Sequence, residues 1–113
     1  MDWTKRRCVP CEGGVPKLDR GSAERLARTL DGWDLEEDRL HRHFAFQDFA
    51  GAMRFVNALA SLAEAEGHHP DFCLHDYREL EVTTSTHAIG GLSENDFVLA
   101  GKIDALARSP VPP

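Results

Sequence analysis

Apolar residues recur at helical spacing in three stretches of the chain, and a polar residue that can begin a helix precedes each stretch. Ser22 is the expected N-cap of the first helix, which ends at Gly32. Ser93 is the expected N-cap of the last helix, with Glu94 and Asp96 in the first turn, where acidic side chains suit the helix dipole. The two apolar faces consist of Ala23, Leu26, Ala27 and Leu30, and of Leu99, Ala100, Ile103, Leu106 and Ala107.

The middle helix is predicted to be the longest, between Asp48 as its N-cap and Gly67 at its end. Its expected core-facing stripe is Phe49, Ala52, Met53, Val56, Leu59, Ala60 and Ala63. Its back carries further small or apolar residues, namely Gly51, Phe55, Ala58 and Leu62. This second face is either a flank of the core stripe or a subunit interface.

Alternation of apolar and polar residues predicts two pairs of strands. A short strand at Trp33–Leu35 is followed by a turn at Glu36–Asp38 and by a second strand over residues 40–46. Another short strand at Phe72–Leu74 precedes a strand rich in β-branched residues at Tyr77–Thr86. The order α-β-β-α-β-β-α predicts an α+β fold, in which three helices pack on one face of a four-stranded antiparallel sheet.

The chain has 113 residues, the length of one ordinary domain. We expect an irregular N-terminal segment over residues 1–21, a single domain over 22–107 and a Pro-rich tail over 108–113. Hydrophobic content of 42% and charged content of 28% are typical of a globular protein, and no apolar run is long enough to span a membrane.

The net charge of −6 argues against a nucleic-acid-binding protein, which is usually basic. The basic run Lys5–Arg7 lies in a terminus that we expect to be flexible.

Three cysteines, an odd number, and the lack of an apolar signal segment favour a reduced, cytoplasmic protein. Cys8 and Cys11 have zinc or redox spacing, but no second pair follows, so a pair of surface thiols is favoured over a shared zinc or a disulfide. Cys73 has apolar neighbours and is expected to be buried.

Several histidines fall at the predicted ends of elements, where side chains converge on a rigid scaffold. His68 and His69 follow the long helix and His87 follows a strand, while Asp96 opens the last helix. Adjacent histidines before Pro70 are hard to explain by packing, which indicates a functional role.

The pattern Glu64-x3-His68-His69-Pro70-x6-Tyr77-x9-His87-x8-Asp96 resembles the signature of the pterin-4a-carbinolamine dehydratases. The resemblance covers roughly residues 22–107, although six residues separate Pro70 from Tyr77 where some family members have five. Flanking segments agree, namely Gly32-Trp33, Phe44-x-Phe46-x-Asp48-Phe49, Ser85-Thr86-His87 and Gly91-Leu92-Ser93-Glu94-x-Asp96.

The resemblance implies a lyase that dehydrates a 4a-hydroxytetrahydropterin to the quinonoid dihydropterin and so recycles the tetrahydrobiopterin cofactor of an aromatic amino acid hydroxylase. It implies His68 and His87 as acid and base, because histidine titrates near neutral pH. His69 would hold the substrate, and Asp96 would fix a histidine tautomer. The expected substrate-binding residues are Glu64, His69, Ser85 and Thr86. No metal and no organic cofactor is expected, since the pterin is the substrate.

Other interpretations of the histidines remain. His41 and His43 lie two apart on one strand face, a spacing that can bind metal, but a solvent-facing pair is favoured, and His75 is expected at the surface. A metal site at His68, His69 and His87 is disfavoured because adjacent side chains diverge.

The competing function is a non-catalytic interaction or assembly module of the same fold, which the second apolar face of the long helix would serve. The resemblance also implies a homodimer or homotetramer formed through a strand edge and the long helix. Neither a nucleic acid nor a membrane is expected among the partners.

Overall fold

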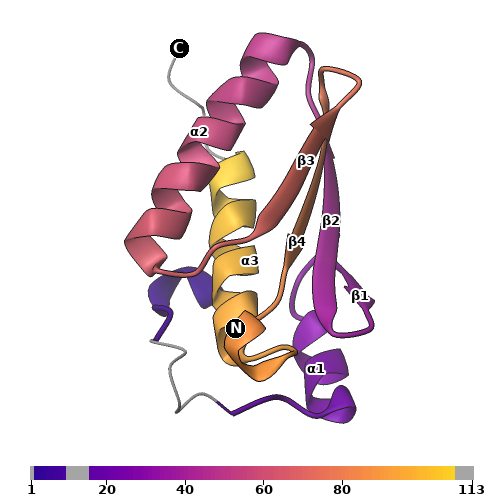
Figure 1. Cartoon of the computed structure of the whole chain (residues 1–113), viewed down its shortest axis with the longest axis vertical. Helices are drawn as coiled ribbons and strands as arrows, with labels where there is room; N and C mark the ends of the chain where they lie inside the picture. Colours follow the sequence, from indigo (N-terminus) through magenta and orange to yellow (C-terminus); the bar gives the residue numbers. More distant parts are fainter. Residues whose placement is uncertain (1, 10–15, 109–113) are drawn as a thin grey trace.

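The computed structural model describes residues 2–9 and 16–108. Five helical segments and four strands follow one another along this part of the chain (Figure 1). They are η1 (Trp3–Lys5), α1 (Arg20–Ala27), β1 (Asp34–Glu36), β2 (Arg39–Ala45), α2 (Phe49–Glu66), β3 (Asp71–His75), β4 (Glu79–Thr84), η2 (His87–Ile89) and α3 (Glu94–Arg108).

The four strands form one antiparallel sheet in the order β1-β2-β4-β3. Helices α2 and α3 lie side by side against one face of the sheet, and α1 lies beside β1 at one end (Figure 1). The predicted α+β fold and its order of helices and strands are confirmed. Among the described residues, no helix combines the length and the apolar character needed to cross a bilayer.

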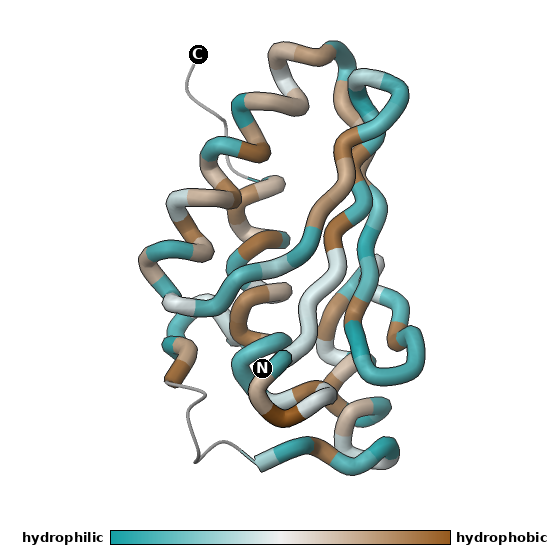
Figure 2. Tube along the Cα trace, viewed as in Figure 1, coloured by the Kyte–Doolittle hydropathy of each residue, from teal (hydrophilic) through white to brown (hydrophobic). Residues whose placement is uncertain are grey.

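Register gives the sheet an apolar inner face and a polar outer face. Leu40 pairs with Thr84 and Phe44 pairs with Leu80, and all four side chains are buried toward the helices. The residues that alternate with them, such as His41, His43 and Glu81, point outward, because successive strand residues alternate between faces. Figure 2 shows the matching alternation of hydrophobic and hydrophilic positions along the strands and helices.

Helix α2 begins and ends where the sequence predicts. The Asp48 carboxylate accepts a hydrogen bond from the Gly51 N–H at 2.7 Å. Gly67 follows the helix with a φ of 66°, in the left-handed region that glycine adopts without strain. Phe55, which the sequence placed on the back of the helix, is buried against Phe44 and Phe46. The back face is therefore partly a flank of the core.

Helix α1 begins earlier than predicted. Asp19, not Ser22, is its N-cap, because the Asp19 carboxylate accepts a hydrogen bond from the Ser22 N–H at 2.8 Å. Ser22 therefore lies in the first turn of α1 rather than before it.

The described part of the N-terminal segment is packed against the domain, which the sequence did not predict. Trp3 is only 2% exposed, stacks near Phe97 and donates its indole N–H to Thr29 at 2.8 Å. It packs on α3, and every residue from 95 to 101 of that helix is buried.

Two residues near β3 differ from the sequence prediction. Tyr77 lies in the turn before β4 with a φ of 53° and is exposed, so it does not begin the strand. Cys73 is exposed rather than buried, because β3 is an edge strand and Cys73 pairs with Glu81 on the outer face of the sheet.

Candidate functional site

The Asp96 carboxylate is the centre of a buried polar cluster where β4 ends and α3 begins. It accepts hydrogen bonds from the hydroxyls of Thr84 at 2.7 Å and Thr86 at 2.8 Å, and from the Ser93 N–H at 3.0 Å. It also bonds the His68 Nε2 at 2.7 Å. All five residues are buried, so the cluster places a carboxylate where water cannot replace its partners.

The cluster determines how His68 is held. The three other partners of Asp96 donate to its carboxylate, so the carboxylate acts as an acceptor and His68 Nε2 carries a proton. A carboxylate that holds an imidazole in one tautomer and orientation is a recurring arrangement in acid–base catalysis. Ser93 lies directly before α3, the position predicted for its N-cap, and its hydroxyl bonds the Thr86 hydroxyl at 2.7 Å.

His69 and Glu64 form an exposed pair at the end of α2. A His69 ring nitrogen bonds the Glu64 carboxylate, and the two side chains are 64% and 77% exposed. They border an apolar hollow of about 270 Å³ between α2 and β3. Its other lining residues are Leu59, Ala60, Ala63, Pro70 and Phe72.

His87 is exposed in η2, directly after the buried Thr86. It lines a second hollow of about 280 Å³ with the neighbouring residues Ser85, Thr86, Gly90 and Gly91. Glu37 and Asp38 in the turn between β1 and β2, and Arg39 at the start of β2, line the same hollow.

The structure brings some of the residues expected at the site into contact and leaves others in separate hollows. Asp96 contacts His68 and Thr86, and Glu64 contacts His69, whereas His69 and His87 line different hollows. The Asp96 carboxylate nevertheless connects the two segments, because its partner His68 precedes His69 and its partner Thr86 precedes His87.

Sequence reasoning missed the structural partners of Asp96, namely Thr84 and Ser93. A signal for Thr84 was present, because it continues the alternation of Leu80 and Val82 and therefore faces inward. A threonine at such a position needs a buried partner.

The remaining histidines and Cys8 lie elsewhere. His41, His43 and His75 are on the outer face of the sheet, where each contacts a carboxylate. Burial and the neighbouring Glu66 raise the pKa of the Cys8 thiol to about 12, which disfavours a reactive thiolate there. Cys11 lies outside the described residues.

Comparisons with known proteins are consistent with these observations. The family model described as pterin 4 alpha carbinolamine dehydratase matches residues 16–106. A protein of Nitrosomonas europaea with the provisional name pterin-4-alpha-carbinolamine dehydratase is 48% identical over 109 residues, which are 96% of each chain.

Two solved structures are also similar. A transcriptional coactivator/pterin dehydratase from Brucella melitensis superposes with a TM-score of 0.76 at 33% identity and covers 81% of this chain and 99% of its own. A pterin dehydratase-like protein, described as a RuBisCO assembly factor in the alpha-carboxysome, gives a TM-score of 0.55 at 29% identity. That match covers 69% of this chain and 89% of the other.

Proposed function

This chain belongs to the pterin 4 alpha carbinolamine dehydratase family, and on that basis we propose that it converts a 4a-hydroxytetrahydropterin to the quinonoid dihydropterin and water. An aromatic amino acid hydroxylase would supply this substrate, because it leaves the 4a-hydroxypterin after each turnover. The cytoplasmic location expected from the sequence remains a prediction.

The elimination needs two proton transfers. An acid gives a proton to the departing 4a-hydroxyl, and a base removes the proton from N5 of the ring, after which the N5–C4a double bond forms and water leaves. Histidine suits both transfers because its ordinary pKa lies near neutral pH. His68 and His87 are the proposed pair, and Glu64 with His69 would bind the pterin.

The observation that carries this proposal is the buried bond between Asp96 and His68. A carboxylate that accepts from Nε2 stabilises the imidazolium that forms when His68 takes up a proton. The second bond, from the Thr86 hydroxyl to the same carboxylate, orders the segment that carries His87. Because the Thr86 hydroxyl is used there, Thr86 would support the site rather than bind the pterin with its side chain.

Steady-state kinetics on single variants test the assignment of roles. His87→Ala and His68→Ala should lower kcat by about 100-fold or more, the usual contribution of a positioned acid or base. His69→Ala should mainly raise KM, by about tenfold, because it removes a binding contact. An unchanged kcat for folded His68→Ala would show that His68 only positions its neighbours.

A second candidate function is an interaction or assembly module of the same fold. Phe72 is 51% exposed on β3, an edge strand whose outer edge pairs with no other described strand. Such an edge can extend its sheet by pairing with another chain. Protein capture by a chain with no dehydratase activity would favour this function.

We also propose that the chain forms a homodimer or a larger oligomer through the β3 edge. Sedimentation at micromolar concentration should show a dimer or tetramer, and Phe72→Glu should shift it toward monomer, because a charge disfavours pairing at an edge. A wild-type chain that sediments as a monomer would contradict this proposal.

A further inference from the structure

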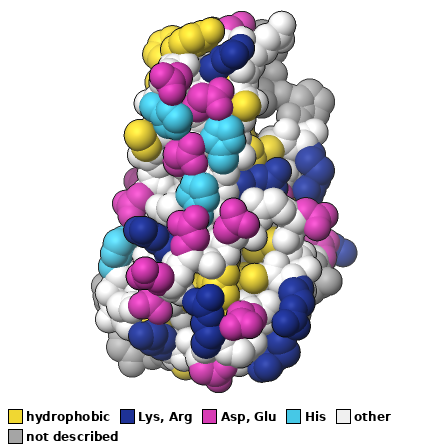
Figure 3. Space-filling view, turned by 90° about the vertical axis from the view of Figure 1, so that its right-hand side faces the viewer, with side chains coloured by type: hydrophobic (Ala, Val, Ile, Leu, Met, Phe, Trp, Pro, Cys, Tyr) yellow, Lys and Arg dark blue, Asp and Glu magenta, His cyan; other side chains and the backbone are white. Residues whose placement is uncertain are grey.

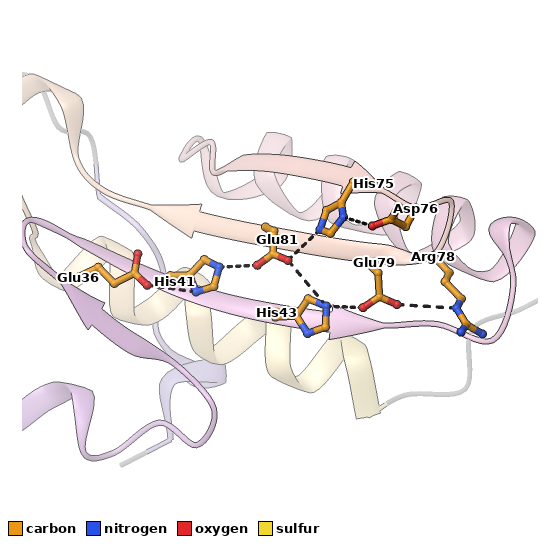
Figure 4. A network of polar contacts seen from close by, with 8 residues as sticks. All are labelled: Glu36, His41, His43, His75, Asp76, Arg78, Glu79 and Glu81. Carbon is orange, nitrogen blue, oxygen red and sulfur yellow. Dashed lines mark hydrogen bonds and ion pairs between the residues drawn. The ribbon is translucent and has the colours of Figure 1, made fainter.

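Histidine and acidic side chains gather on the outer face of the sheet (Figure 3). Glu81, on the central strand β4, accepts from His41 Nε2 at 2.6 Å and from His75 Nε2 at 3.0 Å (Figure 4). His43 bonds Glu79 at 2.7 Å. The Nε2 atoms of His41, His43 and His75 therefore each bond a carboxylate. The other ring nitrogen of His41, Nδ1, has a different environment.

His41 Nδ1 is shielded from solvent and has no hydrogen-bond partner among the described residues. It faces the Glu36 carboxylate, with 3.5 Å between Nδ1 and Oε2 (Figure 4). Asp34 is the direct cross-strand neighbour of His41 in the β1–β2 pair. One potential ligand atom from each of Asp34, Glu36 and His41 lies within 4.8 Å of the others.

Glu81 bonds one ring nitrogen of His41, Nε2, and the other, Nδ1, lies beside Glu36. A cation bound between Nδ1 and the Glu36 carboxylate would give this shielded nitrogen a partner. Histidines that bind metals usually have this arrangement, in which the other ring N–H donates to a carboxylate.

The spacing also suits a metal ion. Two ligands bound at about 2.0–2.1 Å to a tetrahedral ion are roughly 3.4 Å apart. The distance of 3.5 Å between His41 Nδ1 and Glu36 Oε2 matches this value. Asp34 and Glu36 are exposed, so their carboxylates can adjust around an ion.

We propose that Asp34, Glu36 and His41 form a binding site for a divalent transition-metal ion of the zinc class, with Glu81 orienting His41. One imidazole nitrogen and two carboxylate oxygens are ligands that Zn²⁺ accepts, and water completes the coordination. None of these four residues belongs to the acid–base or pterin-binding set proposed above, so zinc binding here is tested separately from dehydratase activity.

Calorimetric titration of the metal-free, full-length chain with zinc chloride at neutral pH tests the proposal. Wild-type protein should bind one equivalent at this site, and Glu36→Gln and His41→Gln should each weaken that binding by about 10- to 100-fold. His43→Gln is the matched control, because His43 lies on the same strand face, bonds Glu79 at 2.7 Å and approaches only the Glu81 oxygen that His41 does not use, at 3.8 Å. Affinity that falls in His43→Gln, or that stays unchanged in Glu36→Gln, would overturn the site.

Nitrogen-15 spectra of the histidine rings identify the ligand atom. Zinc should shift the Nδ1 resonance of His41 and leave its Nε2 protonated, because Glu81 keeps that proton. Coordination through Nε2, or no change at His41, would contradict the proposal. Thermal unfolding without zinc should be similar for wild type and Glu36→Gln, since Glu36 is exposed, and this comparison separates lost binding from lost folding.

Discussion

Asp96 is the residue with the largest number of partners in the candidate site, and its charge has a structural cost that those partners offset. Four hydrogen bonds converge on two buried oxygens, from Thr84, Thr86, Ser93 and His68. Replacing one carboxylate oxygen with an amide nitrogen would turn N–H donors toward groups that themselves donate. A buried donor without a partner is costly, so the cluster tolerates very little change.

Asp96→Asn should therefore lower the free energy of unfolding by about 2–4 kcal/mol, measured by urea denaturation. Glu94→Gln is the matched control in the same helical turn, because Glu94 is exposed and pairs with Arg6 at the surface. That control should change stability by less than about 1 kcal/mol. Equal effects of the two substitutions would show that the Asp96 cluster does not stabilise the fold.

The sequence indicates some of this residue-scale chemistry and not the rest. The family resemblance implied that Asp96 would hold a histidine, and the bond to His68 agrees with that expectation. The bond to Thr84 depends on how β4 aligns with the start of α3, a tertiary relation that no local pattern contains. The separation of His69 and His87 into two hollows likewise depends on the packed fold.

Among the elements, β3 and β4 are joined across their outer face by an ion pair that depends on pH. Hydrogen bonds from His75 to Glu81 and Asp76 raise the pKa of His75 above its ordinary value of 6.5. The bond from His75 also lowers the pKa of Glu81. A histidine with a raised pKa in the folded state stabilises the fold fully below 6.5, and this stabilisation is lost as the pH rises through the folded-state pKa.

Titration of the His75 ring signals by NMR should thus give a pKa above 6.5 in the wild-type chain. Glu81→Gln should lower that pKa, because it removes the negative charge of the main partner. Stability measured by urea denaturation should decline as the pH rises from 6.5 through the folded-state pKa of His75, and His75→Gln should reduce this decline. A wild-type pKa at or below 6.5 would contradict the assigned contacts.

Local patterns predict the ends of α2, but they do not predict the start of α1 or the place of β3 in the sheet. Asp48 and Gly67 satisfy the backbone groups of α2 by contacts within a few residues, so sequence spacing identifies them. Whether a strand lies at the centre or the edge of a sheet is decided by distant pairing. The apolar neighbours of Cys73 therefore suggested burial, although β3 is an edge strand.

For the whole molecule, the main difference from the sequence prediction is the packing of the first residues on the last helix. Trp3 and Gly101 lie nearly a hundred positions apart in the sequence, but a Cβ atom at Gly101 would be 2.3 Å from the Cβ of Trp3. Glycine is required there because the N-terminal segment approaches α3 so closely. A terminal run with several punctuating glycines and prolines gave no local sign of this contact.

Gly101→Ala should lower the melting temperature, corresponding to a loss of about 1–3 kcal/mol, because the added methyl group displaces Trp3. In a helix without this contact, the same change would stabilise the protein by about 1 kcal/mol. A Trp3→Gly background removes the clashing Cβ, so there Gly101→Ala should be neutral or stabilising. A destabilising effect of the same size in both backgrounds would contradict the packing of Trp3 on α3.

Catalysis is the central claim, and the most direct measurement is the rate at which purified chain dehydrates freshly generated 4a-hydroxytetrahydropterin at neutral pH. The account predicts a rate well above that of buffer and a loss of about 100-fold or more in His87→Ala that remains folded. A wild-type rate equal to buffer, or a folded His87→Ala variant as fast as wild type, would contradict it.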